Sequence, residues 1–477
     1  MVLVAHVAAV AGASDSSGYM SHARLLGEGH LHVQPRIIPG LPRVSGARLL
    51  YVPLGFMPAP NGDGLVPTYP VGLSLFIVAL KPLCGWRYAG DLAMTLHALG
   101  GLAAMYALGR MLGLGRIWAS IGVAILAVSP LYLFMSLQAM SDVPALLWTT
   151  LAVLAALKSR DRPWWALLAG AAMAVDVLLR PTNVLAFAPL AVALGTSPRR
   201  WALLMLGGLP GAAFFFGHSL AAYGSVAATG YGDVSIDFGM RYVPETLLHY
   251  ARWLPVLFTP LVAFALGLPW LGGESPRNRW LLGTWVVAFA AFYATYRCTH
   301  EVWWYLRFLL PAVPALVVGA LLVLRALFRR APAWADPGRS LAACAALLVL
   351  VGIAEGRPNR FLHPFTIGTD ETRYQRLANW MQQNVPADAV CLTEQASGAL
   401  FYYKPFALVR WDAIYRATAG KVESAIRAAK RPLYAVLFPF EIRDAGVLRD
   451  VMPGHWIEVG KVDDVAIFRR DFDAAKP

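Results

Sequence analysis

The sequence predicts a polytopic α-helical membrane protein with a small C-terminal α/β domain. The first observation is composition: 58% of the 477 residues are apolar and 14% are charged, whereas soluble domains are about 45–50% apolar and about 25% charged. The second is that apolar runs follow one another as far as residue 356, many of them close to the length of about 20 residues that crosses a bilayer. We therefore expect a transmembrane domain over residues 1–356, with an outer loop over 14–68, and an extracytoplasmic α/β domain over 357–477.

Eleven apolar runs are expected to cross the membrane as helices. The first, residues 1–13, reaches only about 20 Å at about 1.5 Å per residue, against a hydrocarbon core of about 30 Å. It is therefore either a partial span or the end of a span that begins upstream. The run over 69–83 is also short, contains Lys81-Pro82 and is not expected to cross. The other ten runs are 88–109, 117–137, 143–157, 164–179, 183–195, 200–222, 253–271, 280–296, 306–327 and 340–355.

Lys and Arg residues predict the orientation, because cytoplasmic loops carry an excess of them. If the run over 69–83 does not cross the membrane, the basic loops all lie on the cytoplasmic side. If that run does cross, the same loops lie on the outer side, against the rule. We therefore expect the outer loop 14–68, Asp142, Arg180, the 223–250 loop and the 297–305 loop on the extracytoplasmic side of the inner (plasma) membrane. The basic residues expected on the cytoplasmic side are Arg110, Arg116, Lys158, Arg160, Arg162, Arg199, Arg200, Arg277, Arg279, Arg325, Arg329, Arg330 and Arg339.

The net charge of +13 does not indicate a nucleic-acid partner. The basic residues cluster in short loops between apolar runs, which membrane topology explains, and no nucleic-acid-binding motif is present. The four cysteines are scattered without metal-ligand spacing, so neither a zinc site nor a disulfide framework is expected.

The last 120 or so residues show the pattern of a small α/β domain. Helices are expected over 370–384 and 421–430, and buried strands over 389–392, 407–411 and 433–438. No GxGxxG motif or P-loop is present, so no nucleotide site is expected.

Two carboxylates are the candidates for acid–base chemistry on the outer side. Asp15 follows the first apolar run and precedes a helical pattern over 19–26, and Asp142 precedes Pro144 at the start of another run. Both positions also suit helix capping, and capping and catalysis can coexist. Two acids at one surface can share proton transfer or hold a divalent cation.

The segment 296–311 is the most specific candidate for binding an anion. It places Arg297, Glu301, Tyr305 and Arg307 beside two tryptophans at the mouth of a predicted span. An aromatic belt with snorkelling side chains explains the aromatic residues but not arginines on the outer side. Because an unpaired Arg within an apolar run costs at least about 2.5–3.5 kcal/mol, an anionic partner such as a phosphate is expected for Arg307.

Arg180 has two interpretations. It lies four residues after Asp176 on a predicted helix, so the two can form an ion pair. It also lies at the outer end of that helix, before Pro181, where it can join the phosphate-binding group. The 223–250 loop adds five candidate substrate contacts: Tyr231, Asp233, Asp237, Arg241 and Tyr242.

Several motifs follow one another along residues 1–330. They are Asp15 after the first span with Tyr19 four residues on, Pro67-Thr68-Tyr69-Pro70-Val71-Gly72, Ser129-Pro130, Ser141-Asp142, Arg180-Pro181-Thr182 and Trp303-Trp304-Tyr305-Leu306-Arg307-Phe308-Leu309-Leu310-Pro311. Taken together in this order, the motifs resemble the bacterial C-type (GT-C) glycosyltransferases. The nearest patterns are those of the aminoarabinose lipid A transferases and the protein O-mannosyltransferases.

The resemblance implies transfer of a sugar from a polyprenyl-phosphate donor to an acceptor hydroxyl of a lipid, glycan or protein, usually with inversion. It implies that Asp15 is a general base or positions the acceptor, and that Arg307 holds the donor phosphate. Two features differ from the family pattern. Ser16 stands where relatives often carry a second acid, and Trp303-Trp304 do not precede Asp-Tyr-Gly as they do in oligosaccharyltransferases, so that activity is not assigned.

A transporter or flippase of a lipid-linked or anionic substrate is the alternative from another functional class. Transporters place ionisable groups near the midplane of the membrane, on interrupted helices in repeated halves. Asp176 is the deepest acid here, and no repeat is apparent in the sequence. The enzyme therefore remains the preferred prediction.

Overall fold

The computed structural model describes residues 2–38, 49–60, 62, 64–271, 275–330 and 337–473. Residues 39–48 of the expected outer loop and the side chains of Arg330 and Arg339 lie outside this description. The chain forms two compact units. The first comprises Met1–Val7, Leu92–Phe215 and Asp233–Ile367, and the second comprises Ala8–Asp91, Phe216–Gly232 and Gly368–Pro477.

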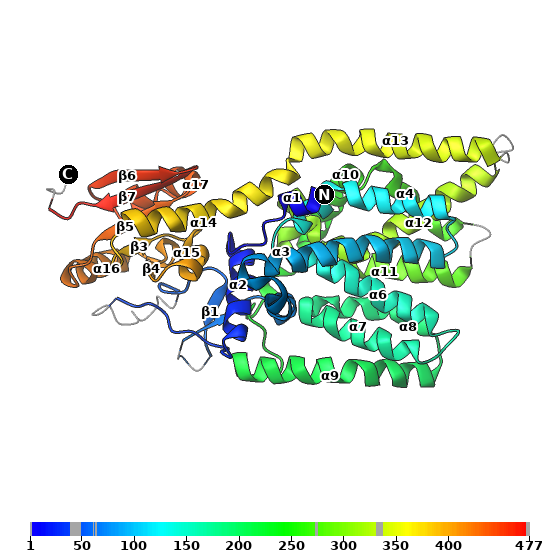
Figure 1. The fold of residues 1–477 in the computed structure, drawn as a ribbon, viewed down its shortest axis with the longest axis horizontal. Coiled ribbons are helices and arrows are strands. Elements are labelled where there is room, and N and C mark those ends of the chain that lie inside the picture. The colour runs from blue at the N-terminus through cyan, green and yellow to red at the C-terminus, as the bar shows by residue number, and fades with distance from the viewer. Residues whose placement is uncertain are drawn as a thin grey trace. The chain divides into compact units, whose positions relative to one another are not determined.

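The first unit is a bundle of helices around one apolar core (Figure 1). The core includes Trp285, Phe289 and Leu321, all fully buried. The elements are α1 (Val2–His6), the end of α3 (Val71–Met111), α4 (Arg116–Val128), α5 (Pro130–Ser136), α6 (Asp142–Lys158), α7 (Trp165–Leu179), η1 (Pro181–Ala186), α8 (Phe187–Leu194), most of α9 (Pro198–Tyr223), α10 (Val243–Leu257), η4 (Pro260–Trp270), α11 (Pro276–Ala294), η5 (Arg297–His300), η6 (Trp303–Ala312), α12 (Val313–Arg330) and α13 (Pro337–Leu362).

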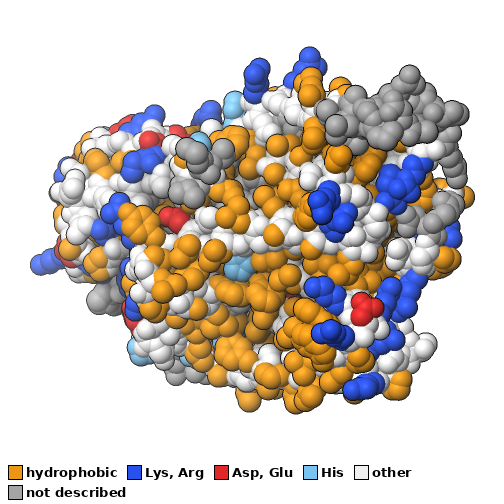
Figure 2. Space-filling view, turned by 45° about the vertical axis from the view of Figure 1, so that its right-hand side comes forward, with side chains coloured by type: hydrophobic (Ala, Val, Ile, Leu, Met, Phe, Trp, Pro, Cys, Tyr) orange, Lys and Arg blue, Asp and Glu red, His pale blue; other side chains and the backbone are white. Residues whose placement is uncertain are grey.

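Large apolar side chains cover much of the outside of this bundle. Met205 on α9 is 64% exposed, and Leu209 on α9 and Ile353 on α13 are similarly open. Figure 2 shows apolar side chains over a wide area, with a group of Lys and Arg side chains at its right-hand border. A surface of this kind suits lipid rather than water.

Three helical stretches in the described part of the chain are long and apolar enough to cross a membrane: Val71–Met111, Pro198–Tyr223 and Trp303–Arg329. The number rises to five if two bent helix pairs each count as one span. The expected count of eleven spans therefore stays a prediction.

Two predicted spans are broken in the structure. The run over 117–137 bends by 63° between α4 and α5, and the run over 253–271 bends by 116° between α10 and η4. The break residues, Ser129 and Thr259, each precede a proline and leave the α-helical region, with ψ of 126° and 153°. A residue before proline is disfavoured in the α-helical conformation, which explains the extended backbone of Ser129. Thr259 in addition has a positive φ of 65°, which the proline does not account for.

Two further segments can be compared with the expected pattern. The first apolar run is helical only over α1, five residues long. The run over 69–83 and the next run together form the 41-residue α3, which consists of two helices that meet at a kink at Gly85, with φ of 71° and ψ of 171°. The two runs are therefore separate helices, as expected. Glycine adopts a positive φ without the Cβ penalty, which allows the kink.

The second unit contains a five-stranded mixed sheet in the order β4-β3-β5-β7-β6. β4 (Ala407–Val409), β3 (Val390–Leu392) and β5 (Leu433–Leu437) are parallel, and β7 (Val465–Arg470) and β6 (Trp456–Val462) are antiparallel additions. The register pairs Val390 with both Ala407 and Leu433. The three predicted strands are confirmed, whereas the β6–β7 hairpin was not predicted.

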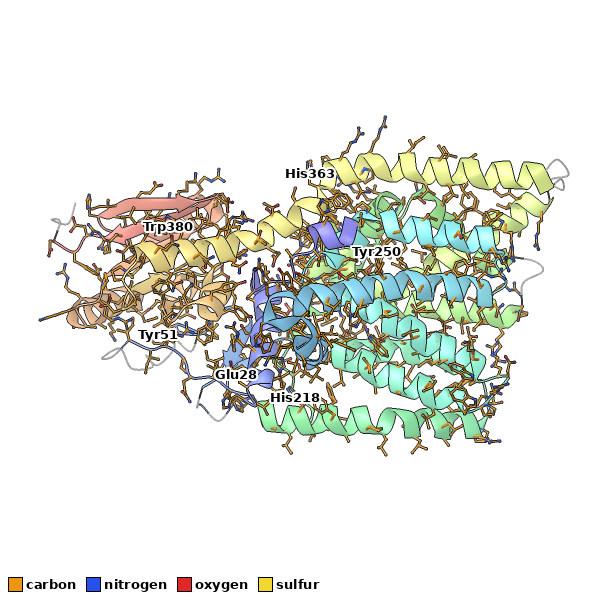
Figure 3. All side chains as sticks on the ribbon, viewed as in Figure 1. Glu28, Tyr51, His218, Tyr250, His363 and Trp380 are labelled. Carbon is orange, nitrogen blue, oxygen red and sulfur yellow. The ribbon has the colours of Figure 1, made fainter. Side chains whose placement is uncertain are left out.

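Helices cover both faces of this sheet (Figure 1). α14 (Ile367–Asn384) and α15 (Ser397–Tyr403) bury Leu377 and Leu400 against one face, and α16 (Arg416–Ala428) buries Ile426 against the other. Trp380 of α14 lies against β6, where a Cβ on Gly460 would come within 2.2 Å of its ring (Figure 3). The predicted helices over 370–384 and 421–430 are thus confirmed, with somewhat different ends.

The N-terminal helix α2 (Ser14–Gly27) belongs to this second unit. Its Leu25 shares an apolar core with Val52, with the β1 (Phe56–Pro58) and β2 (Leu65–Pro67) hairpin and with α14 and α15. Arg24 of α2 lies 4.2 Å from the ring centre of Tyr402. Asp15 is therefore carried by a helix that packs with the C-terminal α/β elements.

Candidate functional site

Asp15 lies in the first turn of α2. Ala13, which has no capping side chain, occupies the N-cap position, and the helix begins at Ser14. The interpretation of Asp15 as the N-cap is therefore wrong. Its partly exposed carboxylate lies at the end of the helix where the dipole stabilises negative charge.

The Tyr69 phenol orients the Asp15 carboxylate. Its hydroxyl donates a hydrogen bond of 2.5 Å to Oδ1 of Asp15 and lies 2.9 Å from the Ser14 hydroxyl. Burial, and then the charge of Asp15, raise the pKa of Tyr69 well above its ordinary value, so the phenol remains a donor. Gly18 makes room for the ring, since a Cβ there would lie 2.3 Å from Tyr69 Cδ2. Two predicted site residues are thus in contact.

Two further tyrosines flank Tyr69. The buried ring of Tyr19 lies 5.1 Å from the Tyr69 ring. Tyr231 meets Tyr69 edge-on at 6.1 Å, and its side chain is exposed. Tyr19 therefore supports the position of Tyr69, whereas Tyr231 offers an aromatic surface to solvent.

Two carboxylates bind the non-helical residues that precede α2. Asp91 accepts a 2.8 Å hydrogen bond from the Ala9 amide. Glu371 of α14 accepts hydrogen bonds from the Ala13 amide, at 3.3 Å to Oε2, and from the Ser16 hydroxyl. Sequence reasoning did not select Glu371, because no local motif marks it and Ser16 is 355 positions away.

A second group of predicted site residues lies in the first unit. Asp142 is the first residue of α6, and Arg180 directly follows α7. The two form a buried ion pair, with side chains 3% and 13% exposed. The carboxylate of Asp176 instead accepts hydrogen bonds from Thr149 at 2.5 Å and Asn183 at 2.6 Å. Arg180 thus pairs with a residue of another helix, Asp142, which lies 38 positions before it in the sequence.

Arg307 lies beside this ion pair. Its Nη1 lies 3.4 Å from Sδ of Met140, two residues before Asp142. Its guanidinium carbon lies 5.6 Å from the ring centre of Tyr305 and 5.3 Å from that of Phe308. Arg180 lies 5.0 Å from the same Phe308 ring, so two guanidinium groups and one carboxylate gather around Phe308.

Arg297 and Glu301 occupy a different environment. Arg297 is 51% exposed and pairs with Asp237 at 3.1 Å and Glu301 at 3.5 Å. Exposed pairs of this kind contribute little to stability, because water screens them. Arg297 is therefore already neutralised at the surface, in contrast to Arg307.

Several predicted cytoplasmic arginines gather at the opposite ends of the same helices. Arg160, after α6, donates to the Ala193 carbonyl at 3.2 Å, and Arg277 donates to Ala193 at 2.9 Å and to Val192 at 3.0 Å. Since α6 has 17 residues, about 25 Å of helix separates Asp142 from this basic end at about 1.5 Å per residue. The orientation of these two ends relative to the membrane stays a prediction.

A divalent cation has no evident ligand set. Within the described ranges, no three or more His, Cys, Asp or Glu side chains are grouped so as to hold a metal ion. Asp15 and Asp142 belong to different compact units. The cation suggested from these two acids therefore stays a prediction.

The contribution of the Asp142–Arg180 ion pair to the stability of the fold can be tested by substitution. Asp142→Ala should lower the free energy of unfolding by about 3–5 kcal/mol, because it leaves a buried guanidinium without this carboxylate. Asp142→Ala/Arg180→Met should recover much of the loss. Thermal unfolding in detergent measures both variants, and an unchanged melting temperature for Asp142→Ala would contradict the buried pair.

No known family model and no curated protein matches the sequence. Solved structures, however, match the fold over nearly the whole chain. ArnT from Cupriavidus metallidurans bound to undecaprenyl phosphate matches with a TM-score of 0.58 and 13% identity, covering 100% of this chain and 97% of that one. Its apo state matches with a TM-score of 0.56 and 14% identity, covering 98% and 95%.

The archaeal oligosaccharyltransferase AglB from Archaeoglobus fulgidus, in complex with an inhibitory peptide and a dolichol-phosphate, matches with a TM-score of 0.52 and 12% identity. This match covers 96% of this chain and 74% of that one. The chain therefore has the fold of the C-type (GT-C) membrane glycosyltransferases, the group that its sequence motifs resemble.

Proposed function

We propose that this protein is a membrane glycosyltransferase that moves a sugar from a polyprenyl-phosphate donor to an acceptor hydroxyl on the extracytoplasmic face. The observation that carries the proposal is that the guanidinium groups of Arg180 and Arg307 both lie against the Phe308 ring. The fold is shared with a protein crystallised with undecaprenyl phosphate. The acceptor is a lipid, a glycan or a protein.

Arg307 is the proposed binding residue for the donor phosphate. Arg180, Arg307 and Asp142 together carry a formal charge of +1, and aromatic rings limit their contact with water. A phosphate completes such a group, since guanidinium nitrogens match its oxygens in pairs. As the glycosidic bond breaks, negative charge grows on the phosphate, so Arg307 stabilises the transition state more than the ground state.

Asp15 is the proposed residue for the acceptor hydroxyl. The hydroxyl oxygen attacks the anomeric carbon, its proton passes to the Asp15 carboxylate, and the bond to phosphate oxygen breaks with its electron pair. The products are the glycosylated acceptor and the polyprenyl phosphate. Tyr69 holds Oδ1 of Asp15 and so limits the directions from which a hydroxyl can approach, as general-base catalysis requires.

Binding of undecaprenyl phosphate tests this function. The purified full chain in nanodiscs should bind it, and cells that lack the protein should accumulate one polyprenyl-phosphate sugar. Transfer of that sugar to a hydroxyl would support the enzyme. Unmodified passage of the lipid-linked sugar across proteoliposomes, without transfer, would instead support a flippase.

The proposed orientation has its own test. A reporter fused after Pro477 should report an extracytoplasmic C-terminus, because the basic loops are expected to face the cytoplasm. A cytoplasmic signal would overturn the proposed orientation but not the chemistry.

A further inference from the structure

The segment before the Asp15 helix is bound by acids from distant parts of the chain. Residues Ala8–Ala13 join α1 to α2 without forming a helix. Asp91 binds the Ala9 amide near the start of this segment, and Glu371 binds the Ala13 amide at its end. The first turn of α2, which carries Asp15, therefore has its backbone fixed by a side chain of α14.

Glu371 is unusually closely fitted to this turn. Its side chain is buried, and the residue is 3% exposed. Its Oε2 also accepts the hydroxyl hydrogen of Ser16, the residue after Asp15. A Cβ placed on Gly12 would lie 2.0 Å from the same oxygen. The carboxylate thus occupies space that any other residue at position 12 would take.

We propose that Glu371 is a positioning residue for Asp15, acting through Ser16 and the Ala13 amide, an inference that rests on the proposed function. The ionised carboxylate holds the start of α2 and thereby keeps the Asp15 side chain directed at Tyr69. Glu371 itself touches no reacting atom in this role. Its loss therefore lowers the rate of transfer without removing the binding of undecaprenyl phosphate.

The titration of Glu371 separates this role from a purely structural one. Burial raises its pKa to about 7, Ser16 and the Ala13 amide lower it, and the charge of Asp15 raises it. The titratable and charged groups that face it are Asp15 from α2, Arg373 and Tyr374 from α14 itself, and Tyr403 from α15. Because the ionised form accepts both hydrogen bonds, activity should rise as pH increases through about 7.

Stability should change in the opposite direction. The pKa is higher in the folded than in the unfolded chain, so the contribution of Glu371 to stability is full below the ordinary value and is lost as pH rises through about 7. A structural role predicts that activity falls where stability falls. The positioning role predicts that activity rises over the range in which stability falls.

The decisive variant is Glu371→Gln in the full chain. The donor for the assay is the polyprenyl-phosphate sugar that accumulates in cells lacking the protein. The kcat of transfer from this donor should fall by about 10-fold to 100-fold, because misplacing a catalytic group by about 1 Å has effects of this size. Binding of undecaprenyl phosphate should be unchanged, the rise in activity near pH 7 should disappear, and the melting temperature at alkaline pH should equal or exceed that of the wild type. Glu371→Asp should restore part of the activity.

Glu394→Gln is the matched control. Glu394 lies in the same unit, and burial raises its pKa to about 7 as well, but the charges that act on it are those of Asp412, Glu441 and Arg410. Its substitution should leave transfer unchanged. Gly12→Ala is a second test of the same contact, because its methyl group displaces the Glu371 carboxylate, and it should reproduce the loss of kcat.

Hydrogen exchange of the amides of residues 12–18 gives a readout independent of activity. It should speed up in Glu371→Gln and not in Glu394→Gln. Two outcomes, each with an active wild type, would overturn the positioning role alone. One is full activity in Glu371→Gln; the other is a loss of activity in Glu371→Gln that is accompanied by a lower melting temperature. A wild type that binds no undecaprenyl phosphate and transfers no sugar would overturn the proposed function and this inference with it.

Discussion

Asp15→Asn should reduce sugar transfer by about 100-fold to 10,000-fold, the range that a general base contributes. The asparagine amide keeps the size of the side chain and can still accept the Tyr69 hydrogen bond. It cannot take the proton of an acceptor hydroxyl. The helix should therefore persist, and the loss should appear in kcat rather than in the binding of undecaprenyl phosphate.

The measurement is turnover of the accumulated polyprenyl-phosphate sugar by purified variants, with melting temperature as the check on folding. Asp388→Asn is the matched control, since its carboxylate is exposed in the same compact unit. Tyr69→Phe removes the donor that orients Asp15 and should give a smaller loss than Asp15→Asn. Full activity in Asp15→Asn would show that this carboxylate has no part in the chemistry.

Local sequence patterns predicted the elements whose burial is uniform. The strands at Val390–Leu392 and Leu433–Leu437 are buried at every position, so they appear as continuous apolar runs. The strand Trp456–Val462 was not predicted because it lies at the edge of the sheet and has no fully buried position, with Glu458 and Lys461 exposed. An edge strand with charged residues has the composition of a loop.

The helix bends could be predicted from sequence only in part. Ser129-Pro130 and Thr259-Pro260 each place a restricted residue within an apolar run. Pro210 and Pro255, however, lie inside the continuous helices α9 and α10. The rule for residues before proline therefore marks candidate positions but does not by itself select the two that bend.

Long-range partners were beyond local reasoning. The spacing of Asp176 and Arg180 suggested an ion pair within one helix, but the loop between α6 and α7 brings Arg180 to Asp142. Glu371 is tied to Ser16 from 355 positions away. No periodicity or motif encodes contacts of this kind, which depend on how helices pack.

Burial separates Arg307, which the sequence favours as the phosphate ligand, from Arg297 of the same segment. Arg297 is exposed and forms ion pairs with Asp237 and Glu301, so a phosphate there would compete with two carboxylates and with water. Arg307 lies among Met140, Tyr305 and Phe308. Charge attraction is stronger where water is excluded, which favours Arg307 as the phosphate ligand.

Arg307→Ala should therefore weaken binding of undecaprenyl phosphate by about 10-fold to 100-fold, the effect of losing hydrogen bonds to a charged group. Transfer should fall further, by about 100-fold to 1,000-fold, because the lost interaction grows stronger as charge develops on the departing phosphate. Binding in nanodiscs and turnover of the accumulated donor measure the two effects separately.

Arg307→Lys distinguishes charge from geometry. Lysine keeps the positive charge but lacks the planar pair of donors that matches two phosphate oxygens, so it should restore binding more than transfer. Arg116→Ala is the control, since Arg116 is exposed at the start of α4 and belongs to the predicted cytoplasmic loops. Arg307 is assigned to the donor phosphate and Asp15 to the acceptor hydroxyl. The variant Arg307→Ala should therefore bind undecaprenyl phosphate weakly, whereas Asp15→Asn should bind it as the wild type does. If both variants bound the lipid equally well, Arg307 would not be its ligand.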